Sequence, residues 1–137
     1  MAVVEREIQV RKFVDEVWNG RNYEAAADLY SDDYTNGFGM GPAARTEPIS
    51  LYHAAFPDLH LDIEDLIVAG GAVVLRCTFR GTDTGGYVGR PPTGRAVEEW
   101  VVTIMHFEND KVVSEWIGAD KLGLFIQLGV LDSPWPG

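Results

Sequence analysis

The spacing of apolar residues along this chain changes near residue 57 from a helical period to a strand period. Before that point, apolar side chains recur every three or four positions, as they do along residues 10–18. After it, apolar and polar residues alternate, as they do along residues 59–64. The first spacing is typical of amphipathic helices and the second of strands with one buried face. The sequence therefore predicts helices first and an antiparallel sheet second.

Cap and turn residues indicate where the expected elements end. The first helix is expected to end at Asn19-Gly20, since both residues tolerate the left-handed conformation of helix ends. A third helix is expected to begin at Thr46 or Pro48 and to end before Pro57. The other expected elements are, in chain order, a helix at residues 23–30, a short strand at 32–38, strands at 59–64, 72–80, 96–107 and 111–119, and a helix at 121–128.

Helices followed by a meander of long strands predict an α+β domain, with the helices on one side of a curled antiparallel sheet. A curled sheet that closes over helices leaves a funnel, which is a natural site for a ligand. No repeat, linker or low-complexity run divides the sequence. We therefore expect residues 1–137 to form one domain.

The charge balance argues against two classes of partner. The chain has 21 acidic and 11 basic residues and a formal charge of −10, with no basic cluster. Nucleic acids and anionic membrane surfaces are bound through positive patches, so neither is an expected partner. No apolar stretch reaches the roughly 20 residues of a membrane span. Because the first eleven residues carry charges and no apolar signal region, we expect a cytoplasmic protein.

The single cysteine, Cys77, excludes an internal disulfide. It lies in an apolar run that is expected to be a strand. A small buried hydrophobe is the simpler interpretation there, and a nucleophile is the less favoured one.

Several short motifs occur together in the second half of the chain. They are Phe56-Pro57-Asp58-Leu59, Gly81-Thr82-Asp83-Thr84-Gly85, Pro91-Pro92-Thr93-Gly94-Arg95, Glu115-Trp116, Asp120 and Gln127-Leu128-Gly129. In this order they resemble the SnoaL-like family of polyketide cyclases, within the NTF2-like folds, and the resemblance runs from the first helix to Gly129. It implies a cone-shaped roll, a homodimer or tetramer, a small apolar or aromatic substrate, and catalysis without a metal or cofactor.

Asp120 is the first candidate for acid/base catalysis. If residues 111–120 form a strand, Asp120 shares a face with Trp116 and is poorly solvated, which raises the pKa of a carboxyl group. The resemblance places the family's catalytic aspartate at this position. The alternative is that Asp120 caps the helix that follows it.

His106 is the second candidate. It is expected to share a strand face with Trp100, Val102 and Ile104, and this apolar face is expected to point toward the interior. The resemblance pairs a histidine on this strand with the catalytic aspartate. The alternative is a histidine at a strand end that is hydrogen-bonded to its neighbours.

Four residues are candidates for substrate binding. Trp100 and Trp116 suit the wall of a pocket for a flat conjugated molecule, although aromatic pairs are also ordinary core. Arg76 lies among apolar residues, so it either pairs with a buried acid, faces the pocket, or extends its stem toward solvent. By the resemblance, Asn36 is a polar pocket residue, and one hypothesis is that it donates to a substrate carbonyl; the alternative is a turn before Gly37.

A metal site is not expected. His60, Asp62 and His106 have the residue types of a non-haem iron triad. However, His60 and Asp62 are expected to face solvent while His106 faces the interior, so the three should not converge. The glycines at 37, 39 and 41 miss the dinucleotide-binding spacing. For association between chains, an outer sheet face with Val101, Met105 and Ile117 is expected.

These observations predict a cyclase or isomerase that closes a ring by aldol-type acid/base chemistry. Asp120 would transfer the proton, and Asn36 would hold a substrate carbonyl. His106 would orient the Asp120 side chain or stabilise the charge that develops during the reaction. One alternative is an epoxide hydrolase or hydroxylase-like enzyme that activates water. That chemistry calls for a second buried acid beside an arginine, and the sequence makes no such acid obvious. Another alternative is a non-catalytic ligand-binding domain.

Overall fold

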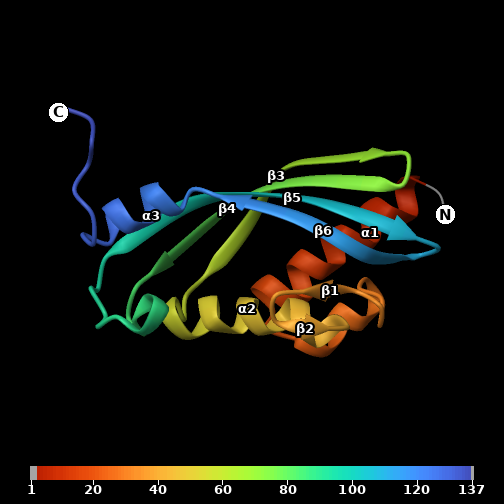
Figure 1. Ribbon diagram of the computed structural model, residues 1–137, viewed down its shortest axis with the longest axis horizontal. Coiled ribbons are helices and arrows are strands. Elements are labelled where there is room, and N and C mark those ends of the chain that lie inside the picture. The colour runs from red at the N-terminus through yellow and green to blue at the C-terminus, as the bar shows by residue number, and fades with distance from the viewer. Residues whose placement is uncertain (1–2, 137) are drawn as a thin grey trace.

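The computed structural model describes residues 3–136 and has a curled four-stranded antiparallel sheet with helices packed against one face (Figure 1). The helical elements are α1 (Val3–Phe13), η1 (Val14–Asn19), η2 (Tyr23–Asp28), α2 (Pro42–Ala55), η3 (Tyr87–Gly89) and α3 (Lys121–Gln127). The strands are β1 (Thr35–Asn36), β2 (Gly39–Met40), β3 (His60–Ala69), β4 (Ala72–Thr82), β5 (Ala96–Glu108) and β6 (Lys111–Ala119). The predicted α+β class and the curled sheet are confirmed. Within the described residues, no helix combines the length and apolarity needed to cross a membrane.

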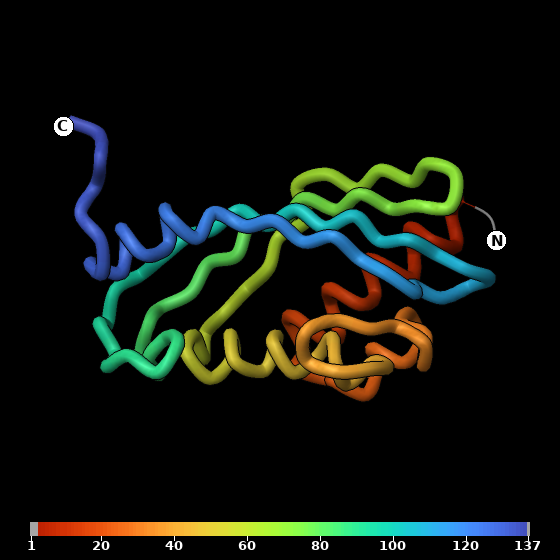
Figure 2. Tube along the Cα trace, in the orientation of Figure 1, coloured from red at the N-terminus to blue at the C-terminus, as the bar shows by residue number. Residues whose placement is uncertain are grey.

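The large sheet has the strand order β3-β4-β5-β6, so each strand pairs with its neighbour in the chain. The tight turns between β3 and β4 and between β5 and β6 contain Gly70 and Asn109, whose φ angles are 57° and 54°. Glycine and asparagine adopt this left-handed conformation more readily than other residues, which is why both turns were predictable. The two ends of the described chain lie at opposite ends of the long axis (Figure 2).

Two irregularities in the sheet decide which side chains point inward. One extra residue, Glu64, lies between Ile63 and Asp65 on β3, and Val113 is the extra residue on β6. An extra residue reverses the alternation of side chains beyond it. On β6, Val112 is therefore buried and Glu115, three positions later, also faces the interior.

The start of α2 corrects the sequence-based bound. The helix begins at Pro42, and Pro48, which was expected to mark its start, lies inside it. Gly41 precedes the helix with a φ of 83°, and proline suits the first helical turn because its N–H has no helical partner there. Inside a helix, however, Pro48 has no N–H to donate to the carbonyl of Ala44. The Asn36 side-chain amide donates to that carbonyl at 2.8 Å.

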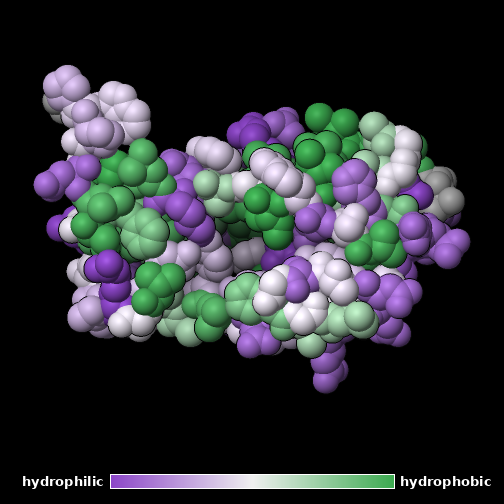
Figure 3. Space-filling model, in the orientation of Figure 1, coloured by the Kyte–Doolittle hydropathy of each residue, from purple (hydrophilic) through white to green (hydrophobic). Residues whose placement is uncertain are grey.

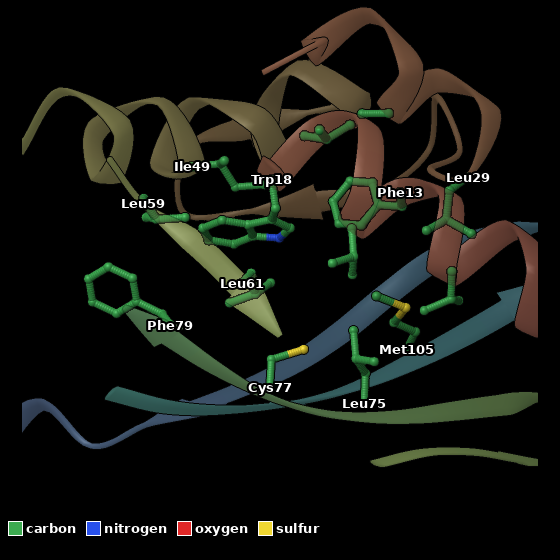
Figure 4. Packing of buried hydrophobic residues seen from close by; sticks show 14 of the residues in the cluster. Phe13, Trp18, Leu29, Ile49, Leu59, Leu61, Leu75, Cys77, Phe79 and Met105 are labelled. Carbon is green, nitrogen blue, oxygen red and sulfur yellow. The ribbon is translucent and has the colours of Figure 1, made fainter. Parts of the chain in front are cut away.

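The core lies between the helices and the inner face of the sheet (Figure 4). Phe13 and Trp18 project from α1 and η1 toward Cys77 and Met105 on the strands. Cys77 is buried, which confirms the expectation for the only cysteine, and burial raises the pKa of its thiol to about 12. A buried aromatic or branched side chain contributes roughly 1.5–3 kcal/mol each.

Asn19, the last residue of η1, is hydrogen-bonded to the sheet. Its side-chain amide donates to the carbonyl of Leu61 at 3.0 Å, and its oxygen accepts from the Leu61 N–H at 2.8 Å. The Asn19 side chain thus bonds both backbone groups of Leu61, as a neighbouring strand would. It also fixes Trp18, the preceding residue, between Ile49 and Leu61 (Figure 4).

Candidate active site

A pocket of about 420 Å³ lies between α2 and the inner face of the sheet. In Figure 3 the surface is hollowed between the sheet and the helices. The apolar part of its wall comprises Trp18, Ile49, Leu61, Phe79 and Val101. Two groups of polar side chains interrupt this wall. They are anchored at Glu99 and Thr103 of β5, which lie about 13 Å apart at 3.3 Å per residue.

The first polar group surrounds Glu115, whose side chain is completely buried. Its carboxylate accepts from the hydroxyls of Tyr30 at 2.9 Å, Tyr34 at 3.1 Å and Thr103 at 2.5 Å. Arg45, itself buried, lies with Nε 3.0 Å from Glu115 Oε1. Burial alone would lower the pKa of the Arg45 guanidinium, but the attraction of Glu115 raises it above its usual value. This group is a buried ion pair with its hydrogen-bonding capacity largely filled.

The second polar group, which we name the Lys121 cluster, consists of Glu99, Lys121, Tyr52 and Tyr87. Lys121 Nζ lies 3.3 Å from Glu99 Oε2 and donates to Tyr87 at 3.0 Å and also to the Tyr52 hydroxyl. Tyr52 in turn donates to Glu99 Oε1 at 3.3 Å. The four side chains come from β5, α3, α2 and η3, so the cluster forms only in the folded chain.

The surroundings of the Lys121 cluster shift its two charged groups toward neutrality. Burial raises the pKa of the Glu99 carboxyl from 4.5 to about 7, and the nearby negative charge of Asp120 adds to this. Burial also lowers the pKa of the Lys121 ammonium from 10.5 to about 8. An acid and an amine with pKa values near the working pH can both give and take protons. Perturbed groups of this kind in a pocket are typical of functional sites.

Asp120 occupies the N-cap of α3, as its alternative interpretation predicted. Its Oδ1 accepts from the Gly123 N–H at 2.9 Å. The residues on either side, Ala119 and Lys121, line the pocket, whereas Asp120 influences it through its charge on Glu99. A catalytic role for Asp120 stays a prediction.

The prediction that His106 points into the interior is wrong. His106 is exposed and lies on the outer face of the sheet with Trp100, which is 48% exposed. The inward residues of β5 are the alternate set, which includes Glu99, Thr103 and Met105. The error has a physical reason: the outer face of this sheet is also apolar, so hydrophobicity does not distinguish the two faces of the strand.

Three further candidates, Trp100, Trp116 and Arg76, also lie on the outer face of the sheet. Trp116 is 59% exposed on the outer face of β6 and forms no part of the pocket wall. Arg76 is exposed on the outer face of β4 and pairs with Asp65, an exposed acid on β3, at 2.7 Å. Neither Arg76 nor the two tryptophans can contact a ligand in the pocket.

The expected association face was assigned to the wrong residues. Val101 and Ile117 line the pocket, and Met105 is fully buried in the core. The outer face instead carries an apolar row across the four paired strands. The row consists of Ile67, Val74, Ile104 and Trp116.

Asn36 lies where the sequence predicted, on a short strand in the pocket wall. Its amide nitrogen donates to Ala44 O and, at 3.3 Å, to the Tyr34 hydroxyl. Its oxygen accepts from the Phe38 N–H at 2.8 Å. These bonds hold the β1–β2 hairpin and Tyr34 in place, and a direct contact with substrate stays a prediction.

The three residues of the considered iron triad do not converge, although the reason differs from the expected one. All three lie on the outer face, with His60 opposite Arg80 and His106 opposite Ala72. These partners are about 26 Å apart along β4 at 3.3 Å per residue. Across residues 3–136, no group of three or more His, Cys, Asp and Glu side chains is arranged to hold a metal ion.

Reasoning from the sequence missed the polar residues that do line or support the pocket. These are Arg45, Tyr52, Glu99, Glu115 and Lys121. One usable signal was Glu99 itself, an acid placed between apolar positions of a long strand. Glu115 gave no such signal, because the extra residue at Val113 changes which positions of β6 face inward.

A family model described as SnoaL-like polyketide cyclase matches residues 8–128. Among solved structures, TsrD from Streptomyces laurentii is 25% identical with a TM-score of 0.88, and the match covers 96% of this chain and 99% of that one. A candidate polyketide cyclase from Acidithiobacillus ferrooxidans is 28% identical with a TM-score of 0.80, over 94% and 98% of the two chains. AclR, a candidate hydroxylase from Streptomyces galilaeus, is 27% identical with a TM-score of 0.83, over 96% and 85%. No curated protein matches the chain significantly.

Proposed function

Because the chain belongs to the SnoaL-like polyketide cyclase family, we propose that it closes a ring in a small apolar carbonyl compound by acid/base chemistry in this pocket. The observation that carries the proposal is Glu99, a fully buried carboxyl group whose pKa is raised to about 7 beside the amine of Lys121. The apolar walls suit the carbon skeleton of such a substrate. The Lys121 cluster offers hydrogen-bond donors for the carbonyl group of the substrate.

The proposed reaction begins with a carbonyl oxygen accepting hydrogen bonds from Lys121 and Tyr52. Glu99 then removes a proton from the neighbouring carbon, and the resulting carbanion attacks a second carbonyl of the same molecule. The proton returns from Glu99 to the new alkoxide oxygen. In a β-dicarbonyl substrate the negative charge spreads over two carbonyl groups, which makes that carbon unusually acidic. Holding a flexible chain in a folded conformation supplies much of the remaining acceleration.

The group around Glu115 has a different role in this proposal. Its carboxylate is already occupied by Arg45 and three hydroxyls, so it is poorly placed to exchange protons with a substrate. We propose that it fixes Tyr34 and, with Asn36, shapes the end of the pocket that receives the far part of the substrate.

Water activation, as in an epoxide hydrolase or hydroxylase-like enzyme, is the second candidate. One observation favours it: the pocket contains a second buried acid beside an arginine, Glu115 with Arg45, which the sequence did not reveal. The same observation limits it, because Glu115 has little free capacity to orient water. A non-catalytic binding domain would have no use for an acid and an amine shifted toward neutral pH.

The apolar row on the outer sheet face supports association into a homodimer or tetramer. Trp100 and Trp116 would be covered in such an assembly, and exposed apolar surface of this kind is typical of contact regions. The pocket lies on the opposite, inner side of the sheet. We propose that association and chemistry use different faces.

The function is tested by assaying a panel of polyketide esters that contain β-dicarbonyl units. The wild-type protein is expected to cyclise at least one of them. Glu99→Gln keeps the size of the side chain but cannot transfer a proton, so turnover should fall by roughly 10²–10⁴-fold. Full turnover in Glu99→Gln on any accepted substrate would refute the assigned role.

A further inference from the structure

Lys121 places a primary amine in the pocket wall under unusual constraint. It is the first residue of α3, directly after the cap at Asp120, so the helix start fixes its backbone. Its Nζ is held by Tyr52, Tyr87 and Glu99 and lies 4.6 Å and 5.3 Å from the two tyrosine ring centroids. The side chain keeps 42% of its surface accessible. The amine is therefore positioned by its neighbours and still reachable.

The same surroundings make the amine chemically available. An ordinary lysine is neutral in fewer than about one molecule in a thousand at pH 7. Burial lowers the pKa of Lys121 to about 8, so on the order of a tenth of the molecules carry a neutral amine at that pH. Glu99, 3.3 Å away, can accept the ammonium proton. A desolvated lysine is a recognised type of nucleophile toward carbonyl carbon.

We propose that Lys121 is a covalent catalyst that forms an imine with a ketone or aldehyde group of the substrate, so that ring closure proceeds through an enamine. The proposal rests on the proposed function, since it takes the same carbonyl substrate in the same pocket. It adds a covalent bond between Lys121 Nζ and the substrate carbonyl carbon, whereas the proposed function gave Lys121 only a hydrogen bond to the carbonyl oxygen. It also narrows the substrate to compounds with a ketone or aldehyde, because esters and amides do not form imines readily.

The steps balance without an oxidant or reductant. The lone pair of neutral Lys121 attacks the carbonyl carbon. The oxygen takes one proton from the attacking nitrogen and one from protonated Glu99, and it leaves as water to give an iminium ion. The Glu99 carboxylate removes a proton from the adjacent carbon, and the electron pair forms the enamine. The enamine carbon attacks the second carbonyl carbon, whose oxygen takes the proton from Glu99. Water then adds to the iminium and releases the product and the free amine.

The experiment uses acetylacetone, a β-diketone that condenses with a reactive amine to a stable conjugated enaminone. The readouts are near-ultraviolet absorbance, intact mass and peptide mapping. The chain has three lysines, Lys12, Lys111 and Lys121. We expect one adduct per chain, mapped to Lys121, whose formation rate rises to half its maximum near pH 8. An adduct spread over all three lysines, or absent, overturns the proposal.

Two variants and one control separate reactivity from folding. Lys121→Arg keeps the positive charge but cannot form an imine, and Lys121→Met keeps the length without charge; both should lose the adduct while retaining their circular dichroism. Lys12→Arg, at an exposed ion pair with Asp28, should form the adduct as wild type does. If Lys121→Arg retains wild-type turnover, the covalent role is refuted.

Two experimental outcomes distinguish imine formation at Lys121 from cyclase activity as such. Turnover of a carbonyl substrate by wild type without an adduct at Lys121 would refute the imine and leave acid/base cyclisation standing. An adduct at Lys121 without ring closure on any β-dicarbonyl ester would support the reactive amine and contradict the cyclase.

Discussion

The side-chain amide of Asn36 supplies the hydrogen bond that Pro48 cannot give. Pro48 lies within α2 and lacks an N–H, and the carbonyl it leaves without a helical donor, that of Ala44, accepts from Asn36 at 2.8 Å. This bond ties the β1–β2 hairpin to the helix that forms one side of the pocket. Asn36, which was predicted to bind substrate, thus connects the hairpin to α2.

Asn36→Ala should destabilise the protein because it leaves the buried carbonyl of Ala44 unsatisfied. We expect a loss of about 1–3 kcal/mol in the free energy of unfolding. In a Pro48→Ala background, the new N–H can satisfy that carbonyl, so the cost of Asn36→Ala should be clearly smaller. Urea unfolding of the four proteins measures the coupling. Equal costs in both backgrounds would contradict this account.

Glu99 should make stability depend on pH in an identifiable window. Its folded-state pKa is raised above the usual 4.5 to about 7, so folding favours the protonated form. This stabilising contribution is full below pH 4.5 and is lost as pH rises through 7, and it amounts to about 3 kcal/mol at 1.4 kcal/mol per pKa unit. Lys121, Asp120, Tyr52 and Tyr87 face this carboxyl group, and most Lys121 side chains remain charged up to pH 7.

Glu99→Gln isolates that contribution. Melting temperatures of wild type and variant should differ between pH 4.5 and pH 7.5, with the variant losing less stability as pH rises. Parallel curves for the two proteins would show that folding does not shift the pKa of Glu99 and would remove the basis for its acid/base role.

Asp120→Asn should keep the helix cap, because asparagine caps nearly as well as aspartate. It removes the negative charge that contributes to the raised pKa of Glu99. If Glu99 is the base, most turnover should survive at pH 8, and the acidic limb of the pH–rate profile should move to lower pH. Asp120→Ala should cost about 1 kcal/mol of stability. Near-complete loss of turnover in Asp120→Asn would instead assign the proton transfer to Asp120.

Arg45→Met should be among the more damaging substitutions in the pocket wall. It leaves the fully buried Glu115 carboxylate without its cation, and breaking a buried pair in this way costs about 3–5 kcal/mol. Adding Glu115→Gln should recover part of the loss, because the second charge is then gone. A double-mutant cycle by chemical denaturation measures this, and additive losses would argue against the pair.

Trp116→Lys should weaken association without reshaping the pocket, because Trp116 lies on the outer face. Light scattering of wild type should give a dimer or larger species, and the variant should shift toward the monomer. His106→Ala, on the same face but outside the apolar row, serves as the matched control and should retain turnover. A monomeric wild type at micromolar concentration would contradict the association proposal.

Local chemistry explains why the fold was largely predictable. The turns at Gly70 and Asn109 need residues that accept a positive φ, and the sequence supplies them. The start of α2 was missed because Pro48 was taken as a boundary. Its missing hydrogen bond is compensated by Asn36, which lies twelve residues earlier in the chain, and no local pattern reveals such a partner.

The candidate site was less predictable because both faces of β5 carry apolar residues. Inside lie Val97, Val101, Met105 and Phe107, and outside lie Trp100, Val102 and Ile104. Alternation identifies the buried face only when the other face is polar. The polar residues that do point inward, Glu99 and Thr103, are stable there because each has partners from other elements.

Substitutions on β5 act on one of two surfaces according to whether the position is odd or even. Val101 lines the pocket, and Glu99 and Thr103 hold its polar side chains, so changes at these positions act on the pocket. Changes at 100, 102 or 104 act on the outer face, through which we propose that chains associate. The pocket and the outer face can therefore change separately by point mutation. Insertion of a single residue early in the strand would exchange both sets at once, turning Trp100 into the pocket and Glu99 toward solvent.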